Sequence, residues 1–329
     1  MVISTRALLA QNSQPGVDEI KTGLGGNLCR CTGYTKIFTA VQAAGQWVKA
    51  PDSVGAGNGA SLASVQDPGF LRPAALDDAL AVLADDSGWR IIGGMTDAGV
   101  QNEHRMKTTR WLDLSIVPEI NTIREDDEAV IVGGGVKFTD IIQSPLLNQW
   151  AQPLVQAARE VGAVQVQNRA TLAGNLINAS PAADSVPALF VLEASVVLQS
   201  TGGRRVIPVS EFASGPGKTA IAPGEILTEV LIPKKKGVGQ EITFFAKLGP
   251  RKSQTISIAT VAVRAWLENG RLKDVLVAMG AVGPTVLFAP ECAQHLMAEP
   301  LTEERIMDAA RLASQECRPI DDLRATAAY

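Results

Sequence analysis

The chain has 329 residues, of which 46% are hydrophobic and 19% charged, with a formal net charge of −4. This composition is typical of a globular protein of two or three domains, and it disfavours a nucleic-acid binder, which normally needs a basic face. We interpret the single basic run, Lys234 to Lys236, as a solvated turn.

No segment of the sequence predicts a membrane span or a secretory signal. The longest apolar stretch, residues 188–198, is interrupted by Glu193 and falls well short of the ~20 residues that a spanning helix needs. The first residues lack a basic segment followed by an uninterrupted apolar one. A cytoplasmic location is therefore the default expectation.

Residues 1–49 are predicted to form a small helical module. Apolar spacing predicts helices over 1–10, 17–21 and 37–48, with a glycine-rich loop between the second and the third. The following residues, 50–66, are rich in Gly, Ser and other small side chains. Such a segment cannot bury enough apolar surface to order itself, so we expect a linker at a domain boundary.

Residues 67–236 show a mixed α and β pattern. The expected strands span 89–93, 120–123, 129–132, 196–199, 205–209 and 226–232, and the expected helices span 74–84, 138–160 and 184–193. Pro145 and Pro153 interrupt the long helical run, and Thr96-Asp97 is a suitable helix start. Residues 167–183 have little periodicity.

Residues 237–329 predict an antiparallel sheet covered by helices. The expected strands span 242–247, 258–267 and 272–279, and the expected helices span 291–298, 302–316 and 321–328. Asn269-Gly270 is a strong hairpin signal between the last two strands. The fold class expected for the whole chain is therefore α+β.

Two cysteines lie one residue apart in the glycine-rich loop. Cys29 and Cys31 stand in the segment Gly25-Gly26-Asn27-Leu28-Cys29-Arg30-Cys31-Thr32-Gly33-Tyr34. Thiolates on loops with accessible backbone N–H groups hold iron–sulfur clusters, whereas adjacent positions of this spacing do not readily form a disulfide. The residues alone leave two readings open, a cluster or two ordinary loop thiols. Cys292 and Cys317, in the C-terminal region, are interpreted as ordinary buried cysteines.

Two further segments could bind a ligand. In Ile91-Ile92-Gly93-Gly94-Met95-Thr96-Asp97-Ala98, a strand leads through two glycines into a helix, where free N–H groups suit a pyrophosphate. The segment 168–184 is dominated by small residues, with Thr171, Asn175 and Asp184 as polar exceptions. The alternatives are a plain strand–turn–helix connection for the first segment, and a packing segment in which Asp184 caps a helix for the second.

The cysteine motif resembles the second 2Fe–2S motif of the xanthine dehydrogenase and aldehyde oxidase family. The resemblance implies that Cys29 and Cys31 are cluster ligands and that the other two ligands precede the first residue of this sequence. It therefore implies a truncated iron–sulfur domain, from a late start site or a split gene, in which the cluster site is incomplete.

The two glycine- and small-residue segments together resemble the FAD-binding domain of the vanillyl-alcohol-oxidase-like (PCMH-type) flavoproteins, in the branch found in molybdenum hydroxylases. The family's motifs are Gly-Gly-x-Thr-Asp and Ala-Thr-x-Gly-Gly-Asn followed by Ser-Pro-x-x-Asp, and this sequence matches them at all specified positions but one. Ala173 departs from the Gly of many relatives, which narrows the backbone approach without excluding FAD. The end of the sequence resembles the C-terminal domain of carbon monoxide dehydrogenase flavoproteins.

The resemblance implies flavin contacts for the residues that match these motifs. The diphosphate and ribityl portion would be lined, mainly through backbone N–H groups, by Ile91, Ile92, Gly93, Gly94, Met95, Thr96, Asp97 and Ala98. Further contacts would come from Thr171 and Asn175 to phosphate or ribityl, Asp184 to ribityl or adenosine, Val161 to adenine, and Leu227 and Lys247 to the isoalloxazine. The alternative for Lys247 is a surface lysine that closes a strand.

The resemblance also implies an architecture and a function. The expected parts are a helical 2Fe–2S remnant (1–49), a linker (50–66), a two-lobed FAD-binding domain (67–236) and a carbon-monoxide-dehydrogenase-flavoprotein-like domain (237–329). The chain would pass electrons from 2Fe–2S clusters to FAD and on to NAD or another acceptor. Its expected partners are a molybdopterin-binding large subunit, of xanthine or N-heterocycle dehydrogenase type, and a separate 2Fe–2S polypeptide.

No catalytic acid or base is expected in this chain, because substrate chemistry would belong to the large subunit. The alternatives are a flavin subunit of a 4-hydroxybenzoyl-CoA-reductase-like or carbon-monoxide-dehydrogenase-like enzyme, a self-contained flavin reductase or oxidase, and an inactive assembly fragment.

Overall fold

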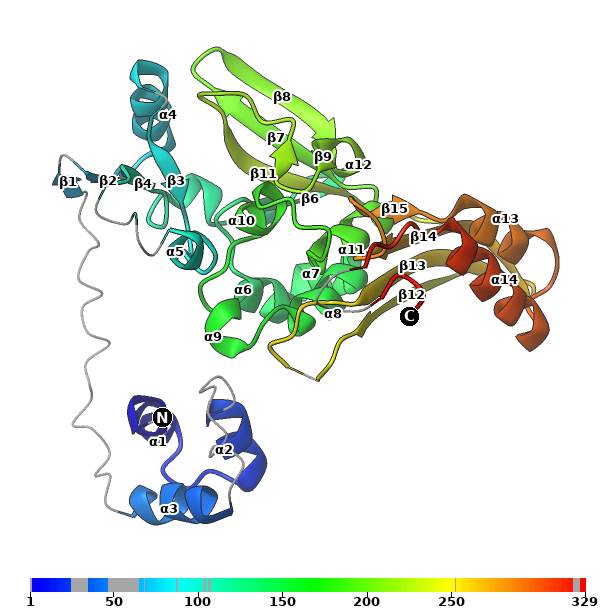
Figure 1. The fold of residues 1–329 in the computed structure, drawn as a ribbon, viewed down its shortest axis with the longest axis horizontal. Coiled ribbons are helices and arrows are strands. Elements are labelled where there is room, and N and C mark those ends of the chain that lie inside the picture. Colours follow the sequence, from blue (N-terminus) through cyan, green and yellow to red (C-terminus); the bar gives the residue numbers. More distant parts are fainter. Residues whose placement is uncertain are drawn as a thin grey trace. The chain divides into compact units, whose positions relative to one another are not determined.

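The structure is a computed structural model. It describes residues 2–24, 35–46, 65–67, 69–86, 88–102, 105, 108–251, 253–321 and 326–329. The chain forms two compact units, one built mainly from residues 1–63 and the other mainly from residues 64–329 (Figure 1). Each unit is described by itself below.

The first unit contains three helices, as the sequence predicted: α1 (Val2–Gln11), α2 (Val17–Leu24) and α3 (Thr35–Gly45). They pack around the buried side chains of Leu9, Ile20, Leu24, Phe38 and Val41. The Gly16 N–H donates to the Glu19 carboxylate and so caps the first turn of α2. Cys29 and Cys31 lie outside the described residues, as does most of the predicted linker.

The second unit begins with a small sheet in the order β1-β2-β4-β3. Its strands are β1 (Val65–Asp67), β2 (Phe70–Arg72), β3 (Arg90–Ile92) and β4 (Trp111–Asp113), and β4 pairs in parallel with both β2 and β3. Helix α4 (Leu76–Asp85) covers it through Leu76, Leu80 and Leu83. β4 was not predicted, because three buried residues give no alternating pattern, and β1 begins inside the predicted linker.

The next lobe is built on a five-stranded antiparallel sheet in the order β5-β6-β11-β7-β8. The strands are β5 (Ile123–Glu125), β6 (Ala129–Gly133), β7 (Ser195–Ser200), β8 (Gly203–Pro208) and β11 (Ile226–Pro233). β5–β6 and β7–β8 are the two predicted hairpins, although β5 starts later than expected because Pro118–Ile120 form a 3-10 turn. β11 joins the hairpins by pairing with both β6 and β7.

The helices of this lobe follow the sequence between β6 and β11. They are α6 (Phe138–Gln143), α7 (Pro145–Trp150), α8 (Gln152–Glu160), α9 (Val164–Gln167), α10 (Leu172–Ile177), α11 (Ser185–Val191) and α12 (Val209–Phe212), followed by the short strands β9 (Ala213–Gly215) and β10 (Lys218–Thr219). Pro145 and Pro153 lie in the first turns of α7 and α8, where proline's missing N–H removes no helical hydrogen bond. They therefore begin helices instead of only interrupting one.

The C-terminal part is an antiparallel sheet between two helical layers (Figure 1). Its strands are β12 (Gln240–Leu248), β13 (Ala259–Glu268), β14 (Arg271–Gly280) and β15 (Leu287–Phe288). Asn269 and Gly270, with φ of 50° and 75°, form the predicted tight turn between β13 and β14. Helices α13 (Pro290–Ala298) and α14 (Glu303–Glu316) pack on one face, and α8 and α11 pack on the other.

Two expectations for this part need correction. The helix predicted over 321–328 is wrong where the chain is described: Asp321 and Thr326–Tyr329 are not helical, and the Ala327 N–H donates to the Asp321 carboxylate in a turn. The solvated turn predicted for Lys234 to Lys236 is confirmed for Lys235 and Lys236, which are exposed. It is wrong for Lys234, whose side chain is 14% exposed and pairs with Glu125. Lys234 and Lys236 both lie over the Trp150 ring.

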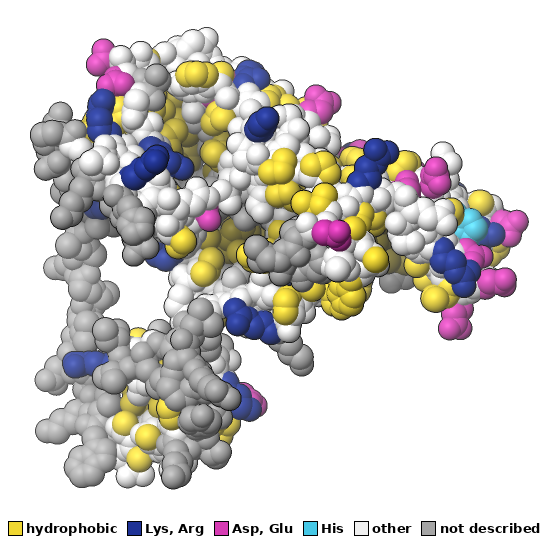
Figure 2. Space-filling model, in the orientation of Figure 1, with side chains coloured by type: hydrophobic (Ala, Val, Ile, Leu, Met, Phe, Trp, Pro, Cys, Tyr) yellow, Lys and Arg dark blue, Asp and Glu magenta, His cyan; other side chains and the backbone are white. Residues whose placement is uncertain are grey.

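Acidic side chains gather at one end of this unit. Figure 2 shows Asp and Glu over the ends of α13 and α14, where Glu299, Glu303 and Glu304 are exposed. Basic side chains lie among them, and Arg305 pairs with Glu299 at 2.9 Å.

Candidate functional site

The turn between β3 and α5 (Ala98–Gln101) carries a row of available backbone donors. Within the described part of the chain, the N–H groups of Gly94, Met95, Thr96 and Asp97 donate to no residue. Met95 has a φ of +63°, a conformation that few residues other than glycine adopt. Successive N–H groups in such a turn form a concave surface that suits oxygen acceptors.

Close backbone contact joins this turn to the second predicted segment. A Cβ at Gly94 would lie 1.7 Å from the Arg169 carbonyl oxygen, so no residue with a side chain fits there without movement of the backbone. The Arg169 Nε also donates to the Gly94 carbonyl oxygen at 3.4 Å. The two motifs, 75 residues apart in sequence, therefore form one continuous wall.

Helix α10 forms the centre of that wall, although the sequence there showed little periodicity. The Thr171 hydroxyl accepts the Gly174 N–H at 3.1 Å and so caps the helix. The N–H groups of Leu172 and Ala173 donate to the carbonyl oxygens of Val136 and Gly134. Capping and these two bonds fix the helix, and the Thr171 hydroxyl still has its proton to donate.

Asn175 lies on the last turn of α10 and is held by a buried neighbour. The Ser185 hydroxyl, which is 0% exposed, donates to the Asn175 Oδ1 at 2.6 Å. Among the described residues, the Asn175 Nδ2 has no hydrogen-bond partner. The Asn175 side chain therefore offers N–H donors.

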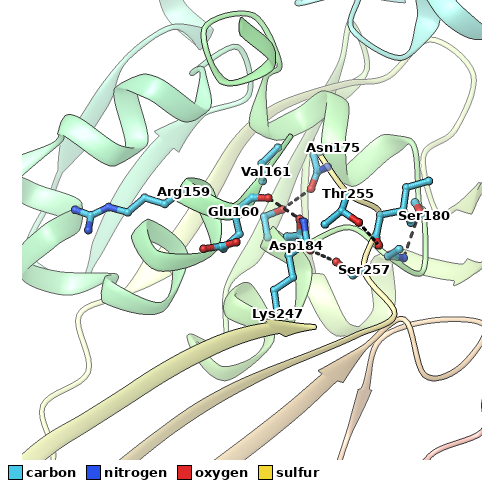
Figure 3. A network of polar contacts seen from close by, with 12 residues as sticks. Arg159, Glu160, Val161, Asn175, Ser180, Asp184, Lys247, Thr255 and Ser257 are labelled. Atoms are coloured by element: carbon cyan, nitrogen blue, oxygen red, sulfur yellow. Dashed lines mark hydrogen bonds and ion pairs between the residues drawn. The ribbon is translucent and has the colours of Figure 1, made fainter. Parts of the chain in front are cut away.

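Asp184 and Lys247 form a buried ion pair, with Nζ to Oδ2 at 2.6 Å and side chains 8% and 4% exposed (Figure 3). Ser257 donates its hydroxyl to Oδ1 at 2.5 Å, and Lys247 also donates to the Glu160 carbonyl oxygen at 2.8 Å. Two of the three ammonium N–H donors of Lys247 are thus used. The two alternative interpretations of these residues from the sequence are therefore wrong. The Asp184 side chain does not cap α11, and the Lys247 side chain does not lie at the surface.

Burial raises the pKa of Asp184 above its ordinary value. The Lys247 ammonium and the Ser257 hydroxyl act in the opposite direction, because both stabilise the carboxylate. The ionised form of Asp184 thus depends on both partners.

Other residues implied by the family motifs lie in the core. Val161, at the end of α8, is 8% exposed, and Leu227, in β11, is 2% exposed. Ile92 is likewise buried. The structure thus brings together the 94–97 turn, Thr171, Asn175, Asp184 and Lys247 through linked contacts, whereas the side chains of Val161 and Leu227 pack inside the lobe.

Sequence reasoning missed three contributors to this site. Ser185 and Ser257 are buried partners of predicted residues, and the Glu160 carbonyl accepts from Lys247. Ser185 directly follows Asp184, so the motif could have drawn attention to it. No signal marks Ser257, which lies 73 residues after its partner.

The described residues contain no group of three or more His, Cys, Asp or Glu side chains that could hold a metal ion. Cys292 is buried and Cys317 half-buried, and burial raises the pKa of both thiols. Of the helices that the structure describes, none is long and apolar enough to cross a membrane.

The sequence matches known family models along most of its length. The model for the FAD binding domain in molybdopterin dehydrogenase matches residues 63–235. The chain belongs to this family. Models for the CO dehydrogenase flavoprotein C-terminal domain and for a [2Fe-2S] binding domain match residues 244–329 and 1–42. Cys29 and Cys31 fall within the last range, but their role as ligands stays a prediction.

Several relatives with similar sequences are named as FAD-binding subunits. The nicotinate dehydrogenase FAD-subunit of Eubacterium barkeri is 30% identical over 73% of this chain and 83% of the relative. The xanthine dehydrogenase FAD-binding subunit of Escherichia coli O157:H7 is 27% identical over 78% of this chain and 88% of the relative. The solved carbon monoxide dehydrogenase of Hydrogenophaga pseudoflava is 27% identical, with a TM-score of 0.72 over 82% of this chain and 93% of the other.

Family membership confirms the predicted α+β fold and the predicted class, an FAD-binding oxidoreductase subunit of a molybdenum hydroxylase. The family models also confirm the two predicted kinds of domain, an FAD-binding domain and a [2Fe-2S] binding domain, while the incomplete cluster site stays a prediction. The names of these relatives describe them as subunits, so they belong to larger enzymes.

Proposed function

We propose that the chain binds FAD between the 91–98 turn and the residues Thr171, Asn175, Asp184 and Lys247. One observation supports this proposal above all: the groups that these residues make available to a ligand are hydrogen-bond donors. They are the backbone N–H groups of 94–97, the Thr171 hydroxyl, the Asn175 amide and one N–H of Lys247. Phosphate oxygens and ring carbonyls are acceptors, so FAD matches this set.

The residues divide the binding work by position. The 94–97 turn and Thr171 would hold the diphosphate, since the Gly94 contact with Arg169 brings them to the same wall. Lys247, fixed by Asp184, would direct its remaining N–H toward the polar edge of the ring system. FAD supplies the redox chemistry when bound, and the protein sets its position and electrostatic surroundings. Val161 and Leu227 would shape the wall from behind, since both pack in the core.

The proposed electron path runs from 2Fe–2S clusters to FAD and on to NAD or another acceptor. Cys29 and Cys31 would be cluster ligands, within the matched [2Fe-2S] binding domain. A molybdopterin-binding large subunit would hydroxylate a xanthine-like or other N-heterocyclic substrate, as the names of the xanthine and nicotinate relatives suggest. The domain boundaries at 49, 66 and 236 belong to the same proposal.

The first test is flavin and iron content of the purified chain. We expect about one FAD per chain by absorbance and by release on denaturation. A Lys247→Met variant should lose FAD on dilution, whereas the control Lys273→Met, on an exposed side chain of β14, should retain it. A folded wild-type chain that takes up no FAD would overturn the proposal. We expect almost no iron in the chain alone, because a 2Fe–2S cluster takes four ligands and Cys29 and Cys31 supply two. Iron that is bound and persists without Cys29 and Cys31 would contradict their role as ligands.

The substrate and the electron acceptor are identified with an activity assay of the assembled enzyme. We expect the complex with its large subunit to reduce NAD with xanthine or nicotinate as electron donor. The likeness to carbon monoxide dehydrogenase favours one alternative, a carbon-monoxide-oxidising enzyme, so carbon monoxide belongs in the same assay. Turnover with an artificial dye but not with NAD would show that the electron acceptor is a compound other than NAD.

A further inference from the structure

Two buried serines lie directly behind the proposed flavin contacts. Ser185 and Ser257 are both 0% exposed. Each donates its hydroxyl to a side-chain oxygen of a site residue. Ser185 donates to the Asn175 Oδ1 at 2.6 Å. Ser257 donates to the Asp184 Oδ1 at 2.5 Å (Figure 3). Neither serine belongs to a motif that implies cofactor binding.

We propose that Ser185 and Ser257 are positioning residues that hold the oxygens of Asn175 and Asp184 away from the cofactor, so that neither of these side chains turns an acceptor oxygen toward FAD. This inference rests on the proposed flavin site. It adds that the two serine hydroxyls determine which atoms of Asn175 and Asp184 face the ligand. The two serines act by the same chemistry on two different side chains.

For Asn175, the choice lies between two orientations of the amide. Rotation by half a turn exchanges the acceptor oxygen and the donor nitrogen. Because the Ser185 hydroxyl donates to Oδ1, the oxygen stays on the buried side and Nδ2 is left for a ligand. Without Ser185, either orientation becomes accessible, and one of them turns an oxygen toward the acceptor oxygens of a phosphate.

For Asp184, the Ser257 hydroxyl occupies the oxygen that Lys247 does not use. Lys247 donates to Oδ2 and to the Glu160 carbonyl, which leaves one ammonium N–H for a ligand. Without Ser257, Oδ1 becomes a buried acceptor with one partner fewer, and buried acceptors are costly to leave unsatisfied. The available Lys247 N–H is the nearest charged donor, and its capture by Asp184 would withdraw it from the flavin.

The ligand that suits this arrangement carries acceptors where it meets the protein. Phosphate oxygens face Asn175 without conflict, and the carbonyl and ring-nitrogen acceptors of the flavin face Lys247. A ligand group that must itself donate a hydrogen bond is disfavoured here, because the Asn175 Oδ1 and both Asp184 oxygens each already accept a hydrogen bond from the protein.

The two serines have different expected signatures. Asp184 titrates, and the groups that act on it are the Lys247 ammonium from β12, the Ser257 hydroxyl and burial itself. Loss of the Ser257 hydroxyl removes a contact that lowers the pKa of Asp184, so the pH at which FAD affinity falls should move upward. Asn175 does not titrate, so loss of Ser185 should weaken binding at every pH alike.

The test measures the FAD dissociation constant of the full chain by flavin fluorescence from acid to neutral pH. Ser257→Ala and Ser185→Ala should each weaken binding about tenfold, which is typical for one lost hydrogen bond of this kind. Only Ser257→Ala should shift the pH midpoint. Ser253→Ala and Ser210→Ala, at exposed positions, serve as matched controls and should behave as wild type.

The Ser257→Cys variant replaces the hydroxyl by a somewhat larger thiol, which is a weaker hydrogen-bond donor. It is the variant to measure if Ser257→Ala does not fold. It should give an intermediate affinity and an intermediate pH midpoint. Wild-type affinity and midpoint in the folded Ser257 variants, or an unchanged affinity in Ser185→Ala, would overturn the inference. A wild-type chain that binds no FAD would instead overturn the proposed function.

Discussion

Lys247 and Arg264 are two buried cations on the same face of one sheet. Lys247 lies on β12 and Arg264 on β13, where Arg264 pairs with Thr243 and Lys247 with Thr260. Directly paired residues of antiparallel strands share a face, so both side chains point toward the layer of α8 and α11. Their side chains are 4% and 2% exposed.

Their partners differ. Lys247 pairs with a carboxylate that is 8% exposed, whereas Arg264 pairs with Glu241, which is 39% exposed. Arg264 also donates to the Lys235 carbonyl and stacks over the Trp266 ring at 4.6 Å. It therefore ties the chain before β12 to the sheet. Burial of a cation alone does not reveal its role; the surroundings of its partner separate a site residue from a structural one.

The largest expected effect on stability is that of Arg264→Met. Loss of the guanidinium leaves the Lys235 carbonyl without this donor and removes the stacking on Trp266. The unfolding free energy should fall by about 2–3 kcal/mol, measured by urea denaturation. FAD affinity of the folded protein should stay within about twofold. A large loss of FAD affinity at unchanged stability would make Arg264 a site residue and remove the contrast.

Lys247→Met should have the reverse profile. We expect FAD affinity to fall about thirtyfold, because a charged donor is lost, with a smaller loss of stability since Asp184 can take up a proton. Fluorescence titration and urea denaturation measure the two effects. The double variant Lys247→Met/Asp184→Asn should recover stability without recovering FAD affinity. Recovery of both would show that the pair serves the fold alone.

The pH dependence of stability separates the two cations further. Asp184 has a raised pKa, so the folded protein binds its proton more tightly than the unfolded chain does. Its contribution to stability is full below the ordinary carboxyl pKa of 3.8 and is lost as the pH rises through the raised value. The stability difference between wild type and Asp184→Asn should fall over that window. Arg264→Met leaves Asp184 and Lys247 in place, so it should keep the pH dependence that Asp184 contributes; loss of that dependence in Arg264→Met would contradict this account.

The smallest effect is expected for an exposed cation of the same unit. Lys236 lies 5.4 Å from the centre of the Trp150 ring. Lys236→Gln should lower the unfolding free energy by about 0.5 kcal/mol, the usual scale of an exposed cation–π contact, and should leave FAD affinity unchanged. Thermal denaturation at two salt concentrations measures it. A loss as large as that of Arg264→Met would mean that burial does not govern these contributions.

Local sequence patterns predicted most of the fold. Asn269-Gly270 predicted one hairpin, the turn residues Thr201 to Gly203 predicted the β7–β8 hairpin, and β11 was predicted as a strand. β4 and α10 were not predicted. The three residues of β4 are too few to show a periodic pattern. Helix α10 depends on hydrogen bonds from the N–H groups of Leu172 and Ala173 to the carbonyl oxygens of Val136 and Gly134. Such long-range support leaves no local signal.

The candidate site was predictable only through family motifs, and only as a set of separate residues. Nothing local indicates that Lys247 is buried or that its partner is Asp184, 63 residues earlier. Serine is common at surfaces, in turns and in cores, so Ser257 carries no pattern of its own. Charge pairing and hydroxyl orientation emerge only when the strands and helices are packed together.

The Asp184–Lys247 pair also has an evolutionary consequence. Asp184 falls within the residues matched by the FAD-binding model, 63–235, and Lys247 within those matched by the C-terminal model, 244–329. Recombination that exchanged one module without the other could leave a buried charge without its counterion. A chimera that joins one of these modules to that of a relative therefore needs a matched aspartate, lysine and hydroxyl across the join.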